Sequence, residues 1–420
     1  MNTIILRTEI QERISAIGAA DILVGIPSFN NARTIGHVVK AVQAGFIKYF
    51  PDKKCVLVNS DGGSTDGTVR VVQDTAIDDS SSILFYHRKG PIFKISTPYH
   101  GIPGKGSAFR TIFQIAEALN VKACAVVDSD LRSITPEWIE LLIKPVIHDE
   151  FDYVAPLYHR HKYDGTITNS IVYPLTRALY GKRVRQPIGG DFGFSGRLAR
   201  FYLTKDVWST DVAKYGIDIW MTTVAIANGF KVCQAFLGAK IHDPKDPGAD
   251  LSAMLYQVVS SAFGLMDFYS ETWKSVTNSV PVPTFGFQYA VGLEPVAVNV
   301  ERMIERFSLG VRELMDIWKE VLPGEVVGYL RGMGEKPIDS FHLSDGIWVE
   351  IVYSFARAYH RQMINKEHLL KSLTPLYIGR TASFVKETWE SGASEVEEKI
   401  EGLCRMFEEK KSFIAEKWDT

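Results

Sequence analysis

Short apolar runs alternate with amphipathic segments in the N-terminal third of the chain, and this alternation constrains the fold more than any other feature. The runs ILVGI (22–26), CVLVN (55–59) and ACAVV (123–127) have the length and residue content of buried strands. The segment 35–46 has its apolar residues at helical spacing. Fully apolar strands separated by helices indicate a mostly parallel sheet that is covered on both faces. We therefore expect an α/β fold.

Polar residues follow each of these predicted strands. PSFNN (27–31) follows the first, NSDGGSTDGT (59–68) ends the second, and DSD (128–130) ends the third. Random placement of 49 acidic residues in 420 would by itself give roughly six acid-x-acid triplets. Ligands of open α/β sheets, however, bind outside the carboxyl ends of the strands. Three polar strand ends together therefore make DSD a candidate site.

The two carboxylates of DSD are suited to a divalent cation. In an extended segment, residues i and i+2 share a face and lie about 7 Å apart. Asp128 and Asp130 could therefore hold Mg²⁺ or Mn²⁺ directly or through water. The triplet alone leaves a second interpretation open, in which both are solvated acids and Asp128 caps the turn.

Four further motifs carry polar residues that could bind a ligand. Asp61 could accept a hydrogen bond from a nucleobase or a ribose, or could merely stabilise a tight turn. Lys105, between two glycines at a predicted helix start, favours phosphate, although a flexible loop would have the same sequence. Asp191 follows two glycines, and Asp218 precedes an apolar helix whose dipole it could complement. A lone His242 is more often structural, but a metal held by two carboxylates has room for an imidazole.

These motifs together resemble a known family. DGGSTDGT and DSD are similar to the GT-A fold of nucleotide-sugar glycosyltransferases. The chain also resembles mannosylglycerate synthase and glucosyl-3-phosphoglycerate synthase in the order and spacing of further motifs, which are PLYHRHKYDGTITN (156–169), RQPIGGD (185–191), YGIDIW (215–220) and GAKIHD (238–243). PGKGSAF (103–109) and FHLSDGIWVEIVYSFARAYHR (341–361) are similar to the first of these enzymes. The resemblance covers roughly residues 20–360.

The resemblance implies a fold and a set of site residues. The fold would be GT-A, a Rossmann-like nucleotide-sugar-binding domain, with a C-terminal helical domain. The metal ligands would be Asp128, Asp130 and His242. The residues that bind the donor sugar nucleotide would be Pro27, Phe29, Asn30, Asp61, Lys105, Asp128 and Ser129. The catalytic residues would be Lys105, Asp191 and Asp218, and the acceptor would be bound by Arg160, Thr166, Thr168 and Arg185.

The implied activity is retaining transfer of glucose or mannose from a GDP- or UDP-hexose to a small hydroxy acid, assisted by Mg²⁺ or Mn²⁺. Asn30 and Asn31 stand where the glucosyl-3-phosphoglycerate enzymes have acidic residues, which leaves the nucleobase and the donor sugar open. Thr166 follows Gly165 where those enzymes have an arginine. We therefore expect α-linked transfer to the 2-position of D-glycerate, giving a glycosylglycerate compatible solute, with 3-phosphoglycerate as the alternative acceptor.

Three other classes of protein were weighed against this activity. A sugar nucleotidyltransferase would need a glycine-rich loop after the first strand, where this chain has PSFNNART. A protein that only binds a nucleotide sugar would not need a full set of groups that stabilise a departing nucleoside diphosphate. The resemblance implies such a set here, which disfavours this class. A GT-A enzyme acting on lipid or polysaccharide is disfavoured because no run of 18 apolar residues provides a membrane anchor.

Composition limits the partners and the compartment. The net charge of −2 offers no basic field for nucleic acid. The four cysteines lie far apart without metal or redox spacing, which favours the cytoplasm.

The length favours more than one domain. We expect a helical extension at 1–20, a catalytic domain at 21–265 and a mainly helical domain at 266–420. Aromatic residues are frequent in the segment 341–361, and such residues are enriched in interfaces. We therefore expect a homo-oligomer.

Overall fold

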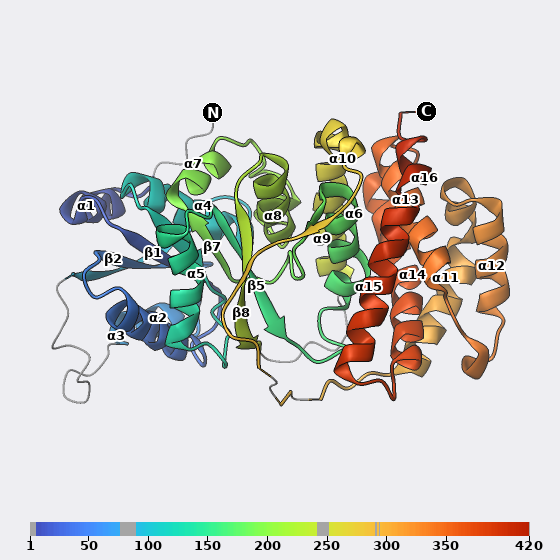
Figure 1. The fold of residues 1–420 in the computed structure, drawn as a ribbon, viewed down its shortest axis with the longest axis horizontal. Helices are drawn as coiled ribbons and strands as arrows, with labels where there is room; N and C mark the ends of the chain where they lie inside the picture. Colours follow the sequence, from blue (N-terminus) through green and yellow to red (C-terminus); the bar gives the residue numbers. More distant parts are fainter. Residues whose placement is uncertain (1–5, 76–89, 242–251, 290–291, 294, 420) are drawn as a thin grey trace. The chain divides into compact units, whose positions relative to one another are not determined.

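The computed structural model describes residues 6–75, 90–241, 252–289, 292–293 and 295–419 (Figure 1). The chain divides into two compact units that alternate along the sequence. The first comprises Met1–His159, Val184–Pro244 and Val282–Gly292, and the second comprises Arg160–Arg183, Lys245–Pro281 and Leu293–Thr420. The consecutive domain boundaries expected from the sequence stay a prediction.

The first unit is built on a mostly parallel eight-stranded sheet, as the sequence predicts. Its strands lie in the order β10-β8-β5-β7-β4-β1-β2-β3, and only β7 runs antiparallel to its neighbours β4 and β5. The strands are β1 (Ile22–Ser28), β2 (Cys55–Asp61), β3 (Ile92–Pro98), β4 (Ala123–Val126), β5 (Tyr153–His159), β7 (Phe192–Ser195), β8 (Val232–Ala239) and β10 (Thr284–Phe285).

The register of the parallel strands brings their polar ends to one edge of the sheet. Ser28 at the end of β1 pairs with Asp61 at the end of β2. Gly25 of β1 pairs with Val126 of β4, so that Asp128 follows two residues beyond the last paired residue. The expectation that the three strand ends lie side by side is therefore confirmed.

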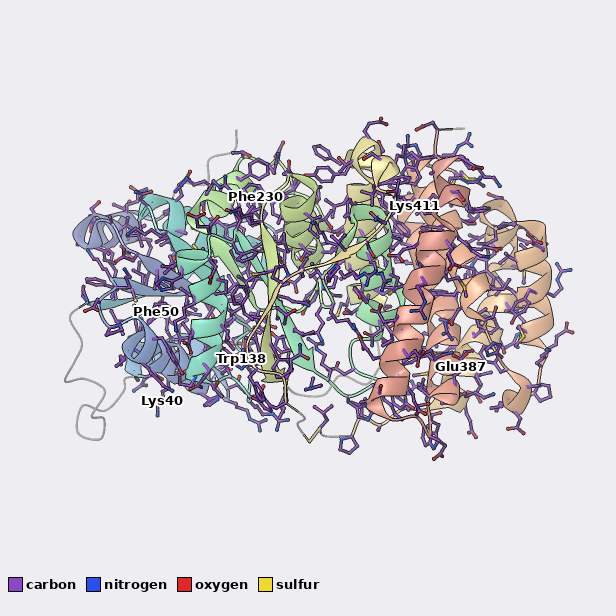
Figure 2. All side chains as sticks on the ribbon, viewed as in Figure 1. Lys40, Phe50, Trp138, Phe230, Glu387 and Lys411 are labelled. Atoms are coloured by element: carbon purple, nitrogen blue, oxygen red, sulfur yellow. The ribbon has the colours of Figure 1, made fainter. Side chains whose placement is uncertain are left out.

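Helices cover both faces of this sheet. They are α1 (Thr8–Ile17), α2 (Ile35–Tyr49), α3 (Thr68–Asp74), α4 (Lys105–Ala118), α5 (Pro136–His148), α7 (Gly196–Leu203) and α8 (Ile217–Ala227). The main core cluster joins the sheet to α2 and α5 and includes Val24, Phe50 and Trp138 (Figure 2). Successive strand residues point to opposite faces. A Cβ on Gly25 would meet Ile112 of α4 at 2.6 Å, so α4 packs closely against the other face.

The edge strand β3 differs from what its sequence indicates. The glycines and prolines of segment 90–106 are typical of a loop, but Ile92–Pro98 forms β3, an edge strand parallel to β2. An edge position tolerates Pro98, because a strand end there needs no further ladder hydrogen bond. The run ILFYHR (83–88), whose composition is typical of a strand, lies outside the described residues.

The second unit is helical apart from a two-stranded pairing of β6 (Lys182–Arg183) with β9 (Val280–Pro281). β9 and β10 are short strands in a region where none was expected. The helices are α6 (Tyr173–Tyr180), α9 (Ser252–Phe268), α10 (Ser270–Ser275), α11 (Val300–Val321), α12 (Gly324–Gly334), α13 (Asp345–His360), α14 (Lys366–Glu387), α15 (Ala393–Glu409) and α16 (Lys411–Ala415).

The aromatic side chains of α13 belong to the interior of the second unit. Trp348, Tyr353 and Phe355 are fully buried. They stabilise the helical core, so these three side chains give no support to an interface with another subunit. The homo-oligomer stays a prediction without this support. None of the helices in the described ranges is both long and apolar enough to span a bilayer.

Candidate active site

Five charged side chains meet at the carboxyl-terminal edge of the sheet in the first unit. Three of the side chains are aspartates and two are lysines, and each stands near the start or the end of a strand or helix. The residues are Lys105 at the start of α4, Asp128 after β4, Asp191 before β7, Asp218 in the first turn of α8, and Lys240 after β8. All are at least 78% buried as side chains, since the most exposed, Asp128, is 22% exposed. The strand ends therefore build a buried cluster of three carboxylates and two ammonium groups.

Asp128 is held between the two lysines. Lys105 Nζ lies 2.8 Å from Asp128 Oδ1, and Lys240 Nζ lies 2.8 Å from Asp128 Oδ2. Burial acts to raise the pKa of Asp128, but the two ammonium groups outweigh burial and hold this pKa well below its usual value. Both lysines are distant from Asp128 in sequence, so the DSD motif does not reveal these partners.

Asp191 is fully buried and joins the cluster to the backbone. Its Oδ1 accepts a hydrogen bond from the Asp128 amide at 2.7 Å, and its Oδ2 lies 2.7 Å from Lys240 Nζ. The Tyr158 hydroxyl also donates to Oδ2. Burial raises the pKa of Asp191, and the nearby Asp128 carboxylate adds to the rise, while Lys240 opposes it.

Gly190 allows this close packing. Its φ is +92°, in the left-handed region that favours glycine. A Cβ there would lie 2.3 Å from Asp128 Oδ2 and 2.9 Å from Lys240 Nζ. The motif GGD thus brings the backbone against the ion pair, a reason for its glycines that spacing alone did not indicate.

Asp218 is the least firmly held acid of the cluster. Its carboxylate lies 3.3 Å from Lys105 Nζ at the nearest oxygen, and it is buried. Burial raises its pKa, although Lys105 opposes the rise. A buried acid with a raised pKa and a buried oxygen that lacks a hydrogen-bond partner is a candidate functional group.

Lys240 was missed by sequence reasoning. It stands two residues before His242 in GAKIHD, and the histidine was the only residue of this motif considered as a ligand. The Lys240 side chain is only 4% exposed. Its ammonium also donates to the Gly189 carbonyl at 2.8 Å. A lysine directly after a mostly apolar strand is the signal that could have identified it, because a buried lysine requires acidic partners.

The expected metal ligands are only partly described. His242 lies outside the described residues. Asp130 is partly exposed, and no ion pair or hydrogen bond engages its carboxylate within the described ranges. No group of three or more acidic, histidine or cysteine residues suited to a metal occurs in those ranges. The two carboxylates nevertheless suit a divalent cation by their chemistry, because Asp130 has no partner within the described ranges and the nearby Asp128 is partly exposed.

Most of the expected donor-binding residues form a rigid polar edge beside the cluster. Asp61 is 4% exposed, and its carboxylate accepts hydrogen bonds from Ser28 Oγ at 2.8 Å and from the amides of Gly63 and Ser64 at 2.9 and 2.8 Å. Its oxygens thus already stabilise the turn after β2. Pro27 lies within β1, paired with Ser60.

The residues after β1 link this turn to the DSD segment. Asn30 has φ +54°, and its side chain accepts from the Thr65 amide at 2.9 Å. Asn31 Oδ1 accepts from Ser129 Oγ at 2.8 Å and from the Phe29 amide at 2.9 Å. The Phe29 ring is 61% exposed. An exposed aromatic ring above a network of engaged polar groups can stack on a planar ligand.

The Gly-Lys-Gly start of α4 differs from the expected phosphate loop. The Gly104 amide donates to the Tyr99 hydroxyl at 2.9 Å, and the Gly106 amide donates to the Lys214 carbonyl at 3.2 Å. A Cβ on Gly106 would lie 1.9 Å from the Val212 carbonyl oxygen. These glycines therefore permit close packing that fixes Lys105, and the two amides are already used.

The expected acceptor-binding residues are divided between the units. In the second unit, Arg160 lies 3.6 Å from Asp164, and the Thr166 hydroxyl contacts the Tyr377 hydroxyl. Thr168 begins a π-helical turn, Thr168–Val172. In the first unit, the Arg185 amide donates to the Gln234 side chain at 3.3 Å.

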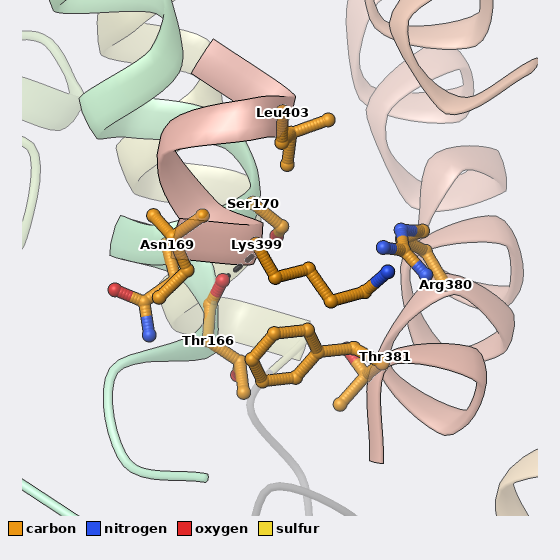
Figure 3. A pocket seen from close by; sticks show the side chains of 9 residues that line it. Thr166, Asn169, Ser170, Arg380, Thr381, Lys399 and Leu403 are labelled. Carbon is orange, nitrogen blue, oxygen red and sulfur yellow. Dashed lines mark hydrogen bonds between the residues drawn. The ribbon is translucent and has the colours of Figure 1, made fainter. Parts of the chain in front are cut away.

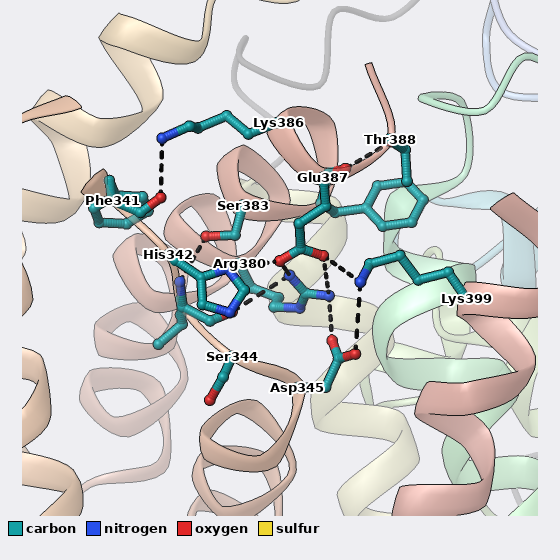
Figure 4. A network of polar contacts seen from close by, with 12 residues as sticks. Phe341, His342, Ser344, Asp345, Arg380, Ser383, Lys386, Glu387, Thr388 and Lys399 are labelled. Carbon is teal, nitrogen blue, oxygen red and sulfur yellow. Dashed lines mark hydrogen bonds and ion pairs between the residues drawn. The ribbon is translucent and has the colours of Figure 1, made fainter. Parts of the chain in front are cut away.

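A small pocket lies inside the second unit (Figure 3). Its volume is about 20 Å³, the room of a single water molecule. Arg380 and Lys399 contribute to its wall, but both cations are paired with Asp345 and Glu387, as Figure 4 shows. Because these charges are neutralised within the unit, the pocket is no candidate for binding an anion.

One family model matches the N-terminal half of this chain. Residues 23–208 match the family model described as glycosyl transferase family 2. No curated protein sequence matches the chain significantly.

Similar solved structures include glucosyl-3-phosphoglycerate synthase of Mycobacterium tuberculosis in two complexes. The complex with Mn²⁺, UDP and glucosyl-3-phosphoglycerate has 22% identity and a TM-score of 0.44, covering 62% of this chain and 84% of that chain. The complex with Mg²⁺ and UDP has 21% identity and a TM-score of 0.44, covering 62% and 83%. Likenesses this distant assign no substrate. The family model therefore identifies residues 23–208 as the part of the chain that is similar to glycosyl transferase family 2.

Proposed function

We propose that the protein is a retaining glycosyltransferase that moves glucose or mannose from a GDP- or UDP-hexose to D-glycerate with the help of a divalent cation. The observation that carries this proposal is the placement of Lys105 and Lys240 around Asp128, at the sheet edge where α/β proteins bind nucleotides. The family 2 match over residues 23–208 supports the reaction class.

Lys105 and Lys240 suit the donor diphosphate. As the bond to the sugar breaks, the departing nucleoside diphosphate gains negative charge. Positive groups fixed near the oxygens before the reaction stabilise this charge without reorganising at the moment of reaction. Lys105 Nζ is held by Asp128 and Asp218. Burial acts to lower the pKa of Lys105, but these carboxylates outweigh burial and raise the pKa, so the ammonium stays charged. Phe29 offers its exposed ring to the nucleobase.

A Mg²⁺ or Mn²⁺ ion would be held by Asp130 and Asp128, with His242 as a further ligand that only the resemblance implies. When bound, it would neutralise charge on the diphosphate. Retention without a protein nucleophile requires the acceptor hydroxyl to attack from the face that the leaving group vacates. Asp218 and Asp191 would orient the sugar and the acceptor on that face.

The lysine and the arginine of segment 160–169 already have partners within the second unit. Lys162 Nζ donates to the carbonyls of Thr388 and Trp389 at 2.7 and 2.8 Å, and Arg160 pairs with Asp164. A phosphorylated acceptor brings about two negative charges and is normally met by an arginine or a helix N-terminus. These engaged cations favour D-glycerate, whose single carboxylate needs only hydroxyls and amides.

The test is a matrix of donors and acceptors. UDP-glucose, GDP-glucose, UDP-mannose and GDP-mannose are each combined with D-glycerate, D-lactate and 3-phosphoglycerate in Mg²⁺ or Mn²⁺. Released nucleoside diphosphate and product mass are measured, and the anomeric proton coupling of the product reports retention. Transfer to D-glycerate with an α linkage supports the proposal. Absence of transfer for every pair refutes it.

A further inference from the structure

Segment 160–169, here called the acceptor loop, is bound to α14 and the turn after it by three side chains. Lys162 Nζ donates to the carbonyls of Thr388, Trp389 and Ser391 at 2.7, 2.8 and 3.2 Å. The Tyr163 hydroxyl donates to the Val385 carbonyl at 3.3 Å. The bonded carbonyls belong to the last turn of α14 and to the turn that follows it. The C-terminal part of α14 therefore fixes one side of the loop.

The third tie lies nearer the middle of α14. The Thr166 and Tyr377 hydroxyls form a buried hydrogen bond, and the residues are 5% and 2% exposed. Burial raises the pKa of Tyr377 to about 12, so the phenol stays protonated at neutral pH. Thr381 Oγ1 donates to the Tyr377 carbonyl at 2.9 Å. Tyr377 is thus a buried side chain whose hydrogen bond to Thr166 fixes the position of the loop.

The two threonines of the loop have different surroundings. The Thr166 hydroxyl is engaged by Tyr377, whereas the Thr168 hydroxyl makes no hydrogen bond within the described ranges. Between the start of the loop and these threonines, Gly165 has φ +75°, a sharp reversal that favours glycine. Thr168 then opens the π-helical turn Thr168–Val172, a geometry common at functional sites. Thr166 therefore anchors the loop, and Thr168 keeps its hydrogen-bonding capacity for another group.

We propose that Tyr377 is a positioning residue for acceptor binding, which acts by holding Thr166 so that the loop presents the Thr168 hydroxyl to the carboxylate of a hydroxy-acid acceptor. This inference rests on the proposed function. Tyr377 is more than 200 residues away in sequence, and only the fold brings it to the loop.

The experiment compares Tyr377→Phe with Tyr353→Phe. Tyr353 is a matched control in the same unit, because it is also fully buried and its hydroxyl donates to the Phe407 carbonyl at 2.6 Å, away from the loop. Steady-state kinetics use D-glycerate and whichever donor the wild type accepts. Tyr377→Phe should raise the acceptor KM about tenfold, which is about 1.4 kcal/mol of acceptor binding. The donor KM should change less than twofold. Tyr353→Phe should leave both KM values at the wild-type level.

A mutant cycle separates positioning from simple stability. Tyr377→Phe leaves the buried Thr166 hydroxyl without a partner, which is costly, whereas the double variant with Thr166→Val removes both partners and should regain stability. If Tyr377 acts through Thr166, all three variants should share the same raised acceptor KM. Recovery of the acceptor KM together with stability, or additive losses, would overturn the inference.

Lys162→Met tests the same loop by removing a different set of contacts to the segment after α14. Its control is Lys94→Met, because Lys94 Nζ likewise donates to three carbonyls near the end of a helix, those of Val72, Gln73 and Thr75. Lys162→Met should raise the acceptor KM and Lys94→Met should not. If the wild type is active and all loop and control variants have the same acceptor KM, this inference is wrong while the proposed function stands. A wild type that transfers sugar to no hydroxy acid overturns the proposed function and this inference with it.

Discussion

The Lys240 ammonium lies 2.7 Å from the fully buried Asp191 carboxylate. The same ammonium bonds Asp128 at 2.8 Å, so one lysine joins the segment before β7 to the segment after β4. A buried charge of this kind is tolerated only when its partners are in place. The candidate site is therefore also a structural element of the first unit.

The first prediction concerns this lysine. Lys240→Met should destabilise the protein by about 3–5 kcal/mol, because it leaves two buried carboxylates with one fewer counter-charge. Lys48→Met is the control, since Lys48 and Glu137 form a pair with 45% and 46% of their side chains exposed. That change should cost about 0–1 kcal/mol. Urea unfolding measures both, and equal costs would contradict the structural role of Lys240.

The second prediction concerns the divalent cation. Chelator-treated protein should be inactive and should recover with Mg²⁺ or Mn²⁺. Asp130→Asn should weaken Mn²⁺ binding, measured by calorimetry, while the free energy of unfolding changes by no more than about 0.5 kcal/mol, as for most surface substitutions. Asp74→Asn, at an exposed acid on α3, controls for the loss of one charge. Full turnover in chelator would refute the metal proposal.

The third prediction is a pH dependence of stability in the second unit. Lys411 is 9% exposed, donates to the Val276 carbonyl and lies at the start of α16 (Figure 2). Burial lowers its pKa from 10.5 to about 8. Between these two values the unfolded chain binds more protons than the folded chain, so this lysine makes stability rise with pH across that interval.

The comparison with Lys411→Met isolates this effect. The free energy of unfolding of the wild type, minus that of Lys411→Met, should increase by about 2–3 kcal/mol between pH 8 and pH 10.5. Lys319→Met, which removes a lysine with 48% of its side chain exposed, controls for general charge effects. A difference that stays flat or falls over this range would show that the Lys411 ammonium is not desolvated.

The fourth prediction concerns the acceptor. We expect kcat/KM for D-glycerate to exceed that for 3-phosphoglycerate at least tenfold, which is about 1.4 kcal/mol of transition-state binding. Thr168→Val should lower acceptor turnover and leave donor affinity unchanged, because Thr168 is 7% exposed and its hydroxyl makes no hydrogen bond within the described ranges. A tenfold preference for 3-phosphoglycerate would contradict the argument from the engaged charges of Lys162 and Arg160.

The local pattern of the sequence determined the strands and most of the helices of the first unit. Apolar runs such as 55–59 can be buried only in a covered sheet, and the turn residues after them could be assigned to its carboxyl-terminal edge. The edge strand β3 escaped prediction because Gly90, Pro91 and Pro98 frame it with loop-like residues. Its strand character comes from pairing with β2, which is a non-local interaction.

The sequence by itself determined that Asp128, Asp191, Asp218 and Lys105 are unusual residues, because each stands where a buried element begins or ends. Only the tertiary structure decided which of them are partners and added Lys240 and Tyr377. Lys240 follows a strand that lies more than 100 residues beyond Asp128, and the length of a salt bridge depends on strand order and register. Sequence spacing carries no information about such distances, since the chain returns to the same edge of the sheet through separate crossovers.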